Sequence, residues 1–224
     1  MTQLNKKIAI VTGAGNGFGE GIAQAYVREG AKVIVADING QAANRVAESM
    51  GAQASAFTCD VTQKAQVQAL VQHCVDTFGA PDIVVNNAGT TWGAPLESYP
   101  VKGWEKVMQL NVTAVFTCIQ QFLPLLRKAG SAANPARIIN IGSVAGISSF
   151  GEQAYAYGPS KAALHQLSRI LARELVSQHI NVNVIAPGRF PSKMTQHIGN
   201  DEHALAEDTA LIPMKRWGRE EEMA

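Results

Sequence analysis

The sequence predicts an α/β fold in which a doubly wound parallel sheet carries helices on both faces. Short apolar runs rich in valine and isoleucine recur along the 224 residues, and segments with helical periodicity lie between them. This alternation is typical of a parallel sheet whose strands are buried on both sides. Because no linker-like segment interrupts it, we expect residues 1–224 to form a single domain.

Each element follows from its local pattern. Apolar runs of β-forming residues predict strands near residues 7–12, 31–36, 53–58, 82–86, 136–141 and 180–186. The segments between them predict helices near residues 17–29, 40–50, 63–78, 101–128 and 155–178. Pro124 lies late in the fourth helix and is expected to end or kink it there, because proline lacks the N–H group of a helical residue.

A glycine-rich turn follows the first predicted strand, in the order Thr12-Gly13-Ala14-Gly15-Asn16-Gly17-Phe18-Gly19. Glycines allow a tight turn and let backbone N–H groups approach a pyrophosphate at the start of the next helix. The spacing is T-G-x-x-x-G-x-G, which differs from G-x-G-x-x-G. The second predicted strand ends on Asp37, where an acid would bind the ribose hydroxyls of an adenosine. Together these features predict a dinucleotide site in a Rossmann fold.

Tyr157 and Lys161 stand four residues apart, so a helix would place both side chains on one face. A phenol alone is a poor base, because its reference pKa is about 10, and a neighbouring ammonium stabilises the phenolate. Gly158 and Pro159 are tolerated in a first helical turn, so we expect Tyr157 at the helix start. The pair could therefore carry a proton to or from a substrate oxygen, although the same spacing also occurs on ordinary solvated helix faces.

Five motifs follow one another in the order of the short-chain dehydrogenases/reductases, and the chain resembles this family from Lys7 to its last residue. They are Thr12 to Gly19, Asp60-Val61, Asn86-Asn87-Ala88-Gly89, Ser143 with Tyr157 and Lys161, and Pro187-Gly188. The second half is also similar to the β-ketoacyl reductases associated with rhamnolipid synthesis. The resemblance implies hydride transfer between NAD(P)(H) and a secondary alcohol or ketone, with a 3-oxoacyl compound among the candidate substrates.

By this resemblance four residues form the catalytic set. Tyr157 exchanges the proton, Lys161 lowers its pKa and binds the nicotinamide ribose, and Ser143 holds the substrate carbonyl. Asn111 would hold a water that connects Lys161 to solvent, unless its side chain is satisfied by a nearby backbone carbonyl. We reject Ser143 as a hydrolase nucleophile, because residues 141–145 lack the G-x-S-x-G elbow.

The resemblance also implies cofactor contacts near the carboxyl ends of the strands, where open α/β sheets bind ligands. Asp60 and Val61 would contact the adenine, or Asp60 or Thr62 would cap the next helix. Residues 86–89 would tie strands together beside the ribose, or form a plain Asn/Gly turn. Residues 187–195 would form a flap over the nicotinamide, or a surface loop. The predicted cofactor set is Gly13, Asn16, Gly17, Phe18, Gly19, Asp37, Asp60, Val61, Asn87, Ala88, Gly89, Tyr157, Lys161, Pro187, Gly188, Phe190 and Thr195.

We expect NAD(H) to be preferred, with NADP(H) as the second choice. Asp37 would pair with the ribose hydroxyls and repel a 2′-phosphate. Ile38 stands where an NADP enzyme often carries arginine, and Asn16 is uncharged. The β-ketoacyl reductases that the second half resembles are thought to use NADPH, which argues the other way. Candidate walls of an apolar pocket are Trp92, Tyr99, Phe150, Met194 and Trp217, although the alternative for each is an ordinary core or interface residue.

Composition favours a cytoplasmic protein without a nucleic-acid, membrane or metal partner. Lys and Arg number 19 against 18 Asp and Glu, which removes a global electrostatic argument for nucleic acid. No apolar stretch is long enough for a membrane span, and residues 1–5 leave no room for a signal peptide. Cys59, Cys74 and Cys118 form no C-x-x-C pair, which favours reduced thiols over a disulfide framework or a zinc site.

Residues 220–224 have the acids of a helix start, whereas family members usually continue to one more helix and strand. We therefore expect either a longer protein or another chain that covers the open edge of the sheet. The helices near residues 101–128 and 155–178 predict a homodimer or homotetramer. Its substrate would be a small alcohol, a ketone or an acyl thioester. Alternatives are a sugar-alcohol or other small secondary-alcohol dehydrogenase, or a non-catalytic dinucleotide-binding scaffold.

Overall fold

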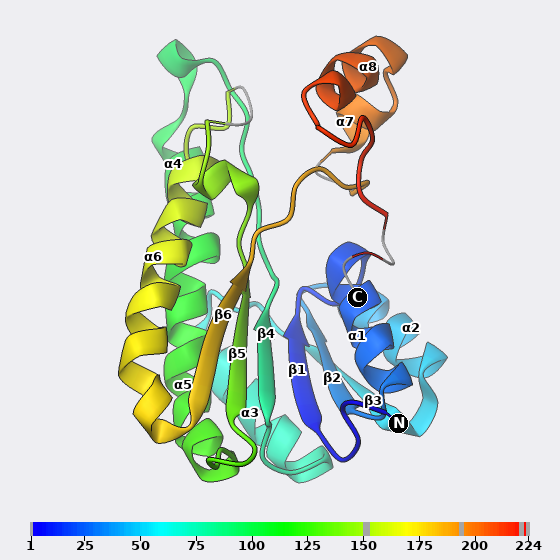
Figure 1. Cartoon of the computed structure of the whole chain (residues 1–224), viewed down its shortest axis with the longest axis vertical. Coiled ribbons are helices and arrows are strands. Elements are labelled where there is room, and N and C mark those ends of the chain that lie inside the picture. The colour runs from blue at the N-terminus through cyan, green and yellow to red at the C-terminus, as the bar shows by residue number, and fades with distance from the viewer. Residues whose placement is uncertain (1, 150–152, 193–194, 220–221, 223–224) are drawn as a thin grey trace.

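Six parallel strands form a single sheet in the computed structural model, which describes residues 2–149, 153–192, 195–219 and 222. The spatial order β3-β2-β1-β4-β5-β6 confirms the predicted doubly wound sheet. All six carboxyl ends point toward the same end of the molecule (Figure 1). The strands are β1 (Ile8–Thr12), β2 (Lys32–Asp37), β3 (Ala54–Thr58), β4 (Ile83–Asn86), β5 (Ala136–Ile141) and β6 (Ile180–Ile185).

Helices cover both faces of this sheet, as the buried strands require (Figure 1). One face packs against α1 (Gly17–Arg28) and α2 (Gly40–Ser49), and the other packs against α3 (Lys64–Thr77), α5 (Ala114–Ala129) and α6 (Tyr157–Leu175). Successive strand residues alternate between these two cores. Ile10 belongs to the core under α3, α5 and α6, whereas Val11 belongs to the core under α1 and α2.

The helix predicted near residues 101–128 is divided in the structure. Helix α4 (Val101–Met108) passes into a π-helical turn, η3 (Gln109–Thr113), and then into α5. Pro124 does not end α5, which continues to Ala129, so of the two expected effects of this proline the helix end is contradicted. Short 3-10 turns, which the sequence did not reveal, lie at Gly51–Gln53 (η1), Leu96–Ser98 (η2), Val144–Gly146 (η4) and Val176–Gln178 (η5).

The segment after β6 carries two further helices, α7 (Gln196–Gly199) and α8 (Glu202–Ala210). They form a small lobe beyond the carboxyl ends of the strands (Figure 1). The Asp201 carboxylate accepts the backbone N–H groups of His203 and Ala204 and so caps α8. Residues 187–192 of the predicted flap carry no helix or strand, and the two helices of the lobe begin after residue 195, so the role of this segment as a flap remains a prediction.

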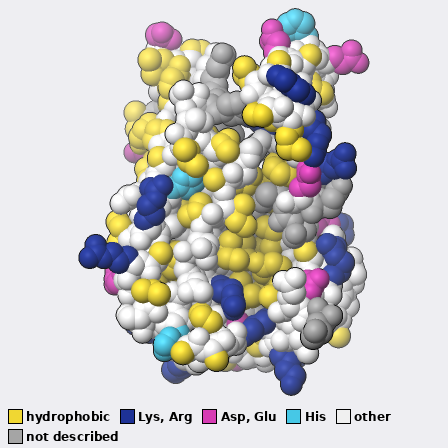
Figure 2. Space-filling view, in the orientation of Figure 1, with side chains coloured by type: hydrophobic (Ala, Val, Ile, Leu, Met, Phe, Trp, Pro, Cys, Tyr) yellow, Lys and Arg dark blue, Asp and Glu magenta, His cyan; other side chains and the backbone are white. Residues whose placement is uncertain are grey.

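Strand β6 is the edge of the described sheet and pairs with β5. Ile185 at its end is 40% exposed, and hydrophobic side chains gather over the central strands between the two groups of helices (Figure 2). Of the predicted last helix, residues 220, 221, 223 and 224 lie outside the described residues. None of the helices described here is both long and apolar enough to cross a membrane.

Candidate active site

The glycine-rich turn between β1 and α1 forms a cradle at the helix start. Gly13 and Gly17 have positive φ angles of 63° and 55°, which favour glycine. A Cβ at Gly19 would collide with the Gly13 carbonyl and with the Asn87 amide. Asn16 makes no capping bond to any described residue, so the first N–H groups of α1 remain available to a ligand. The cradle therefore fits the pyrophosphate of a dinucleotide.

Asp37 at the end of β2 is bound to the same turn. Its Oδ2 atom accepts the Gly15 N–H at 2.9 Å and its Oδ1 atom accepts the Asn39 N–H at 2.8 Å. The carboxylate is buried, with 7% exposed. Close by, the Arg45 guanidinium donates to the Gly15 carbonyl at 3.0 Å and to both oxygens of Glu20. Asp37 is thus engaged by the protein, and a cation lies beside the turn.

The asparagines after β4 tie neighbouring strands together, as predicted, so they are more than a plain turn. The Asn87 amide donates to the Thr12 and Gly13 carbonyls, both at 2.9 Å. Asn86 donates to the Asn140 side chain on β5 at 2.8 Å. These bonds hold the ends of β1, β4 and β5 in register and support the turn.

Asp60 does not cap α3 in the structure. Its Oδ1 atom accepts the backbone N–H and the hydroxyl of Thr62, at 2.9 and 2.7 Å, and α3 begins only at Lys64. These bonds close a local turn after β3. Val61 is buried beside it. Their contact with an adenine ring remains a prediction.

Asn111 lies in the π turn η3 and is 1% exposed. Its Oδ1 atom accepts the Thr90 N–H, and its amide donates to the Thr90 carbonyl and to the Ser160 hydroxyl, all at 2.9 Å. Ser160 in turn donates to the Tyr157 carbonyl at 2.7 Å. The structure therefore shows the predicted bond to a backbone carbonyl, while the water-holding role remains a prediction. It also shows Ser160, which sequence reasoning missed, as the link between Asn111 and α6.

Tyr157 and Lys161 occupy the first turns of α6, as predicted. The Lys161 Nζ atom lies 5.6 Å from the centroid of the Tyr157 ring and donates to the Ile141 carbonyl at 2.7 Å. A Cβ at Gly89 would lie 3.6 Å from the same Nζ atom, so Lys161 also faces the turn after β4. Burial lowers the pKa of Lys161 from 10.5 to about 8.

Ser143 follows β5, and its hydroxyl caps η4 by accepting the Ala145 N–H at 3.1 Å. Burial raises the pKa of Tyr157, while a hydrogen bond with the Ser143 side chain and the positive charge of Arg189 act to lower it. We had expected Lys161 to supply the lowering charge. Arg189 was missed because it is distant in sequence and comes near Tyr157 only when the segment after β6 folds back.

That segment touches the glycine turn through one ring contact and is held together by several bonds of its own. The Phe190 ring packs edge-to-face on Phe18 at 4.9 Å between centroids. Thr195 donates to the Phe190 carbonyl at 2.7 Å, and Asp208 on α8 binds both Arg189 and Trp217. The placement of Thr195 beside a nicotinamide carboxamide remains a prediction, as do the roles of Pro187 and Gly188.

Two of the candidate pocket walls are neighbours, and a third lies on another part of the described chain. Trp92 and Tyr99 are neighbours, since the Tyr99 hydroxyl donates to the Trp92 carbonyl at 3.1 Å. Trp217 lies on the lobe after β6, where its Nε1 atom donates to Asp208 at 2.7 Å. Phe150 and Met194 lie outside the described residues.

Cys59, Cys74 and Cys118 are buried free thiols, and burial raises the pKa of each one. Within the described ranges, no three His, Cys, Asp or Glu side chains are grouped so as to hold a metal ion.

Comparison with known proteins finds similar reductases along nearly the whole chain. It is 61% identical over 220 residues to the rhamnolipids biosynthesis 3-oxoacyl-[acyl-carrier-protein] reductase of Pseudomonas aeruginosa, covering 97% of this chain and 86% of that protein. It is 35% identical over 218 residues to the 3-oxoacyl-[acyl-carrier-protein] reductase FabG of Escherichia coli, with the same coverage of each. Among solved structures, the P. aeruginosa RhlG/NADP active-site complex superposes with a TM-score of 0.94, at 61% identity and coverage of 98% and 87%. The Brucella melitensis 3-ketoacyl-(acyl-carrier-protein) reductase complexed with NADH superposes at 0.89, with 28% identity and coverage of 98% and 88%.

The predicted preference for NAD(H) is contradicted by these findings and was wrong. The relative that is 61% identical was solved as a complex with NADP. The prediction assumed a carboxylate of Asp37 free to repel a 2′-phosphate. In the structure both carboxylate oxygens accept backbone N–H groups, and the Arg45 guanidinium stands at the same turn. Asp37 is therefore already hydrogen-bonded to the backbone of the turn, and its presence alone does not decide cofactor choice.

The family model for short chain dehydrogenases matches residues 7–203, which include the glycine turn, the asparagines after β4, and the serine, tyrosine and lysine of the predicted catalytic set. The order of the strands, the matched residues and the similar proteins all indicate the same family. The chain belongs to the short-chain dehydrogenase family and is an NAD(P)-dependent oxidoreductase that acts on C=O and CH–OH groups.

Proposed function

We propose that this protein is an NADP(H)-dependent reductase of 3-oxoacyl thioesters. The observation that carries this proposal is the convergence of Ser143, Tyr157 and Lys161 at the carboxyl end of β5, beside a glycine cradle that fits a dinucleotide. The substrate class is supported by the 61% identical relative, whose name is that of a 3-oxoacyl-[acyl-carrier-protein] reductase.

The chain's own residues supply the proton and orient the carbonyl. The Ser143 hydroxyl oxygen accepts the Ala145 N–H, and the Ser143 side chain is hydrogen-bonded to Tyr157. In the complex the serine hydroxyl would donate to the substrate oxygen and polarise the carbonyl. The Tyr157 hydroxyl would then donate its proton to that oxygen. Lys161 uses one N–H on Ile141, and its remaining donors would hold the nicotinamide ribose hydroxyls. When bound, the nicotinamide supplies the hydride for the carbonyl carbon.

We propose NADP(H) as the cofactor, with Arg45 as a cation beside the adenosine end of the cradle. Its bonds to Gly15 and Glu20 place the guanidinium beside the turn that Asp37 also binds. The test is kcat/KM with NADPH and with NADH for the wild type and Arg45→Gln. A wild-type preference for NADPH that falls in the variant supports the proposal, and a wild-type preference for NADH refutes it.

The proposed reaction is tested on 3-oxoacyl thioesters, diketones and sugar ketones with both cofactors. We expect the highest kcat/KM with a 3-oxoacyl thioester, and Tyr157→Phe should reduce turnover by about a hundredfold or more. Tyr155→Phe is the matched control, because Tyr155 packs edge-to-face on Tyr99. Turnover by Tyr157→Phe equal to that of this control would remove Tyr157 as the proton donor. Binding of the cofactor without turnover of any carbonyl would instead favour the non-catalytic scaffold.

We also propose a cytoplasmic homo-oligomer assembled through α4, α5 and α6. Trp104, Phe116 and Ile170 on these helices are 41%, 42% and 52% exposed. Exposed apolar side chains on adjacent helices support an interface. Light scattering on purified protein tests the assembly, and a monomer at all concentrations would rule it out.

A further inference from the structure

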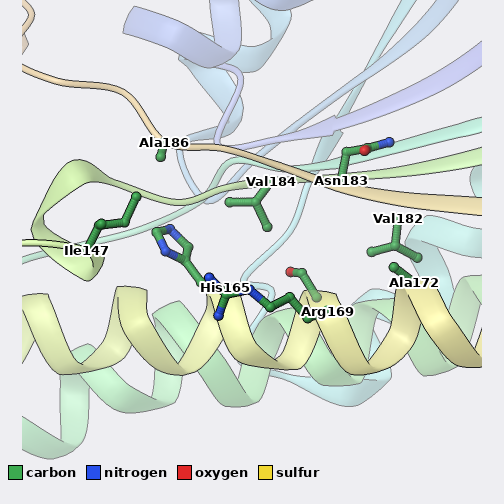
Figure 3. A pocket seen from close by; sticks show the side chains of 9 residues that line it. Ile147, His165, Arg169, Ala172, Val182, Asn183, Val184 and Ala186 are labelled. Atoms are coloured by element: carbon green, nitrogen blue, oxygen red, sulfur yellow. The ribbon is translucent and has the colours of Figure 1, made fainter.

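A buried histidine outside the predicted catalytic set touches the catalytic serine. His165 lies on α6, one turn after Lys161, and is 5% exposed. Its Nε2 atom lies 3.3 Å from the backbone nitrogen of Ser143, which donates to it. The side chain points from α6 toward the segment that carries Ile147 and the strand that carries Val184 (Figure 3).

The hydrogen bond to His165 holds the backbone amide of Ser143, which lies between the amides of Gly142 and Val144. The Gly142 N–H donates to the Ile185 carbonyl at 2.7 Å, and the Val144 N–H donates to the Pro187 carbonyl at 3.0 Å. Those two amides point toward β6 and the residues after it. The Ser143 N–H points to the other side, where the partner is the His165 side chain. The orientation of Ser143 therefore depends on both sides being held.

The imidazole also fills the space beneath this segment. A Cβ at Gly142 would collide with the Nε2 atom, and a Cβ at Gly146 would lie 2.9 Å from Cε1. The backbone before and after Ser143 thus rests directly on the ring. Any change in the ring's position would move the segment that carries the serine hydroxyl.

The ring can accept this bond only in one neutral form. An N–H donor at Ser143 requires Nε2 without a proton, so the proton of the neutral ring is on Nδ1. Burial lowers the pKa of His165, and the charges of Arg169 and Lys161 on its own helix lower it further. The other side chains along the groove beside it are uncharged: Ile147, Ser168, Ala172, Val182, Asn183, Val184 and Ala186. These surroundings maintain the acceptor form at neutral pH.

We propose that His165 is a positioning residue for catalysis, which holds the Ser143 backbone so that the serine hydroxyl meets the substrate carbonyl. The inference rests on the proposed function of Ser143. A direct chemical role for the ring is not part of it, because the described contact of Nε2 is with a backbone amide. The groove along β6 that the ring lines has a volume of about 300 Å³ and belongs to the edge of the sheet.

Two substitutions distinguish the effect of the hydrogen-bond acceptor on His165 from the effect of the space that its ring fills. His165→Leu fills similar space without an acceptor, and His165→Gln returns a polar group near Nε2. We expect His165→Leu to lower kcat about tenfold or more with KM for the cofactor within about twofold, and His165→Gln to recover most of the loss. Ser168→Ala is the matched control, because Ser168 bonds to Asn140 and to the Leu164 carbonyl. It should lose stability without the fall in kcat.

A double-mutant cycle makes the test specific. In a Ser143→Ala background, His165→Leu should change kcat by less than about twofold, because the group that it positions is gone. An equal loss in both backgrounds, or wild-type kcat for His165→Leu, would overturn the proposal. Wild-type activity of Ser143→Ala alone would instead refute the proposed function of the serine, and with it the positioning role.

A measurement independent of activity completes the test. Two-bond ¹H–¹⁵N spectra of the wild type at pH 8 report which imidazole nitrogen carries the proton. We expect His165 to show a protonated Nδ1 and a bare Nε2. A proton on Nε2 would exclude the bond from Ser143 and overturn the proposal, whatever the substrate.

Discussion

The ammonium of Lys161 faces the ring of Tyr157, with Nζ 5.6 Å from the ring centroid, while its hydrogen bond goes to the Ile141 carbonyl. The lysine side chain is therefore held by the protein beside the Tyr157 ring before any ligand binds. The lysine is 5% exposed, so its charged form loses hydration free energy when the chain folds. Its charge thus has a consequence for stability as well as for catalysis.

Lys161→Met should stabilise the protein at pH 7 while abolishing catalysis. The folded pKa of about 8 lies below the ordinary 10.5, so the folded chain loses the lysine proton while the unfolded chain keeps it. Below pH 8 the buried charge of Lys161 lowers the free energy of unfolding by its full amount. Between pH 8 and 10.5 this destabilisation fades, so the wild type becomes more stable as the pH rises. At 1.36 kcal/mol per pH unit the gain is roughly 3 kcal/mol, less the lost bond to Ile141.

Urea unfolding at pH 7 and at pH 9.5 checks this expectation. The advantage of Lys161→Met should shrink at the higher pH. Lys102→Met, which replaces an exposed lysine on α4, is the control and should show no such trend. A variant that is less stable than the wild type at both pH values would show that burial does not strain Lys161.

Arg189→Gln should raise the pKa of Tyr157, because the positive charge of Arg189 lowers it. In the proposed reaction, alcohol oxidation uses the deprotonated phenol, so its rate should rise at a higher pH in the variant than in the wild type. Arg189→Lys retains the charge and is the control. Superimposable pH profiles for Arg189→Gln and the wild type would show that the charge does not act on Tyr157.

Asn111→Leu should cost about 3 kcal/mol of unfolding free energy. The change removes bonds to both backbone groups of Thr90 and to the Ser160 hydroxyl, and buried groups left without partners cost energy. Thermal or urea unfolding measures the loss. Gln109→Leu changes an exposed side chain of the same π turn and should stay within about 0.5 kcal/mol of the wild type. Similar losses in both variants would point to the turn itself and not to the amide.

Gly19→Ala should prevent cofactor binding, whereas Gly21→Ala on the same helix should not. A Cβ at Gly19 meets the Gly13 carbonyl and the Asn87 amide, while a Cβ at Gly21 meets open space. Gly21→Ala should add about 0.5–1 kcal/mol of stability, because alanine favours a helix. Fluorescence titration with NADPH compares the two. Equal affinity in both variants would show that the turn tolerates a side chain.

The sequence by itself determined the fold, the glycine turn and the helix that carries Tyr157 and Lys161, because those features depend on local chemistry. Apolar runs and helical periods located the six strands and the helices α1, α2, α3 and α6 to within a few residues. The glycine turn could be predicted since only glycine takes its backbone angles at low cost, at Gly13 and Gly17. The spacing of Tyr157 and Lys161 likewise placed both on one helix.

The features that could not be predicted from the sequence depend on contacts between residues far apart in the chain. The π turn that brings Asn111 to Thr90 and Ser160 has no local signal, and neither does the approach of Arg189 to Tyr157. The preference for NAD(H) was inferred from Asp37, Ile38 and Asn16, and the structure adds the hydrogen bonds that the Asp37 carboxylate accepts. Only the folded chain decides which groups an ionised side chain meets, because Coulomb energy and hydrogen bonding depend on distance in space.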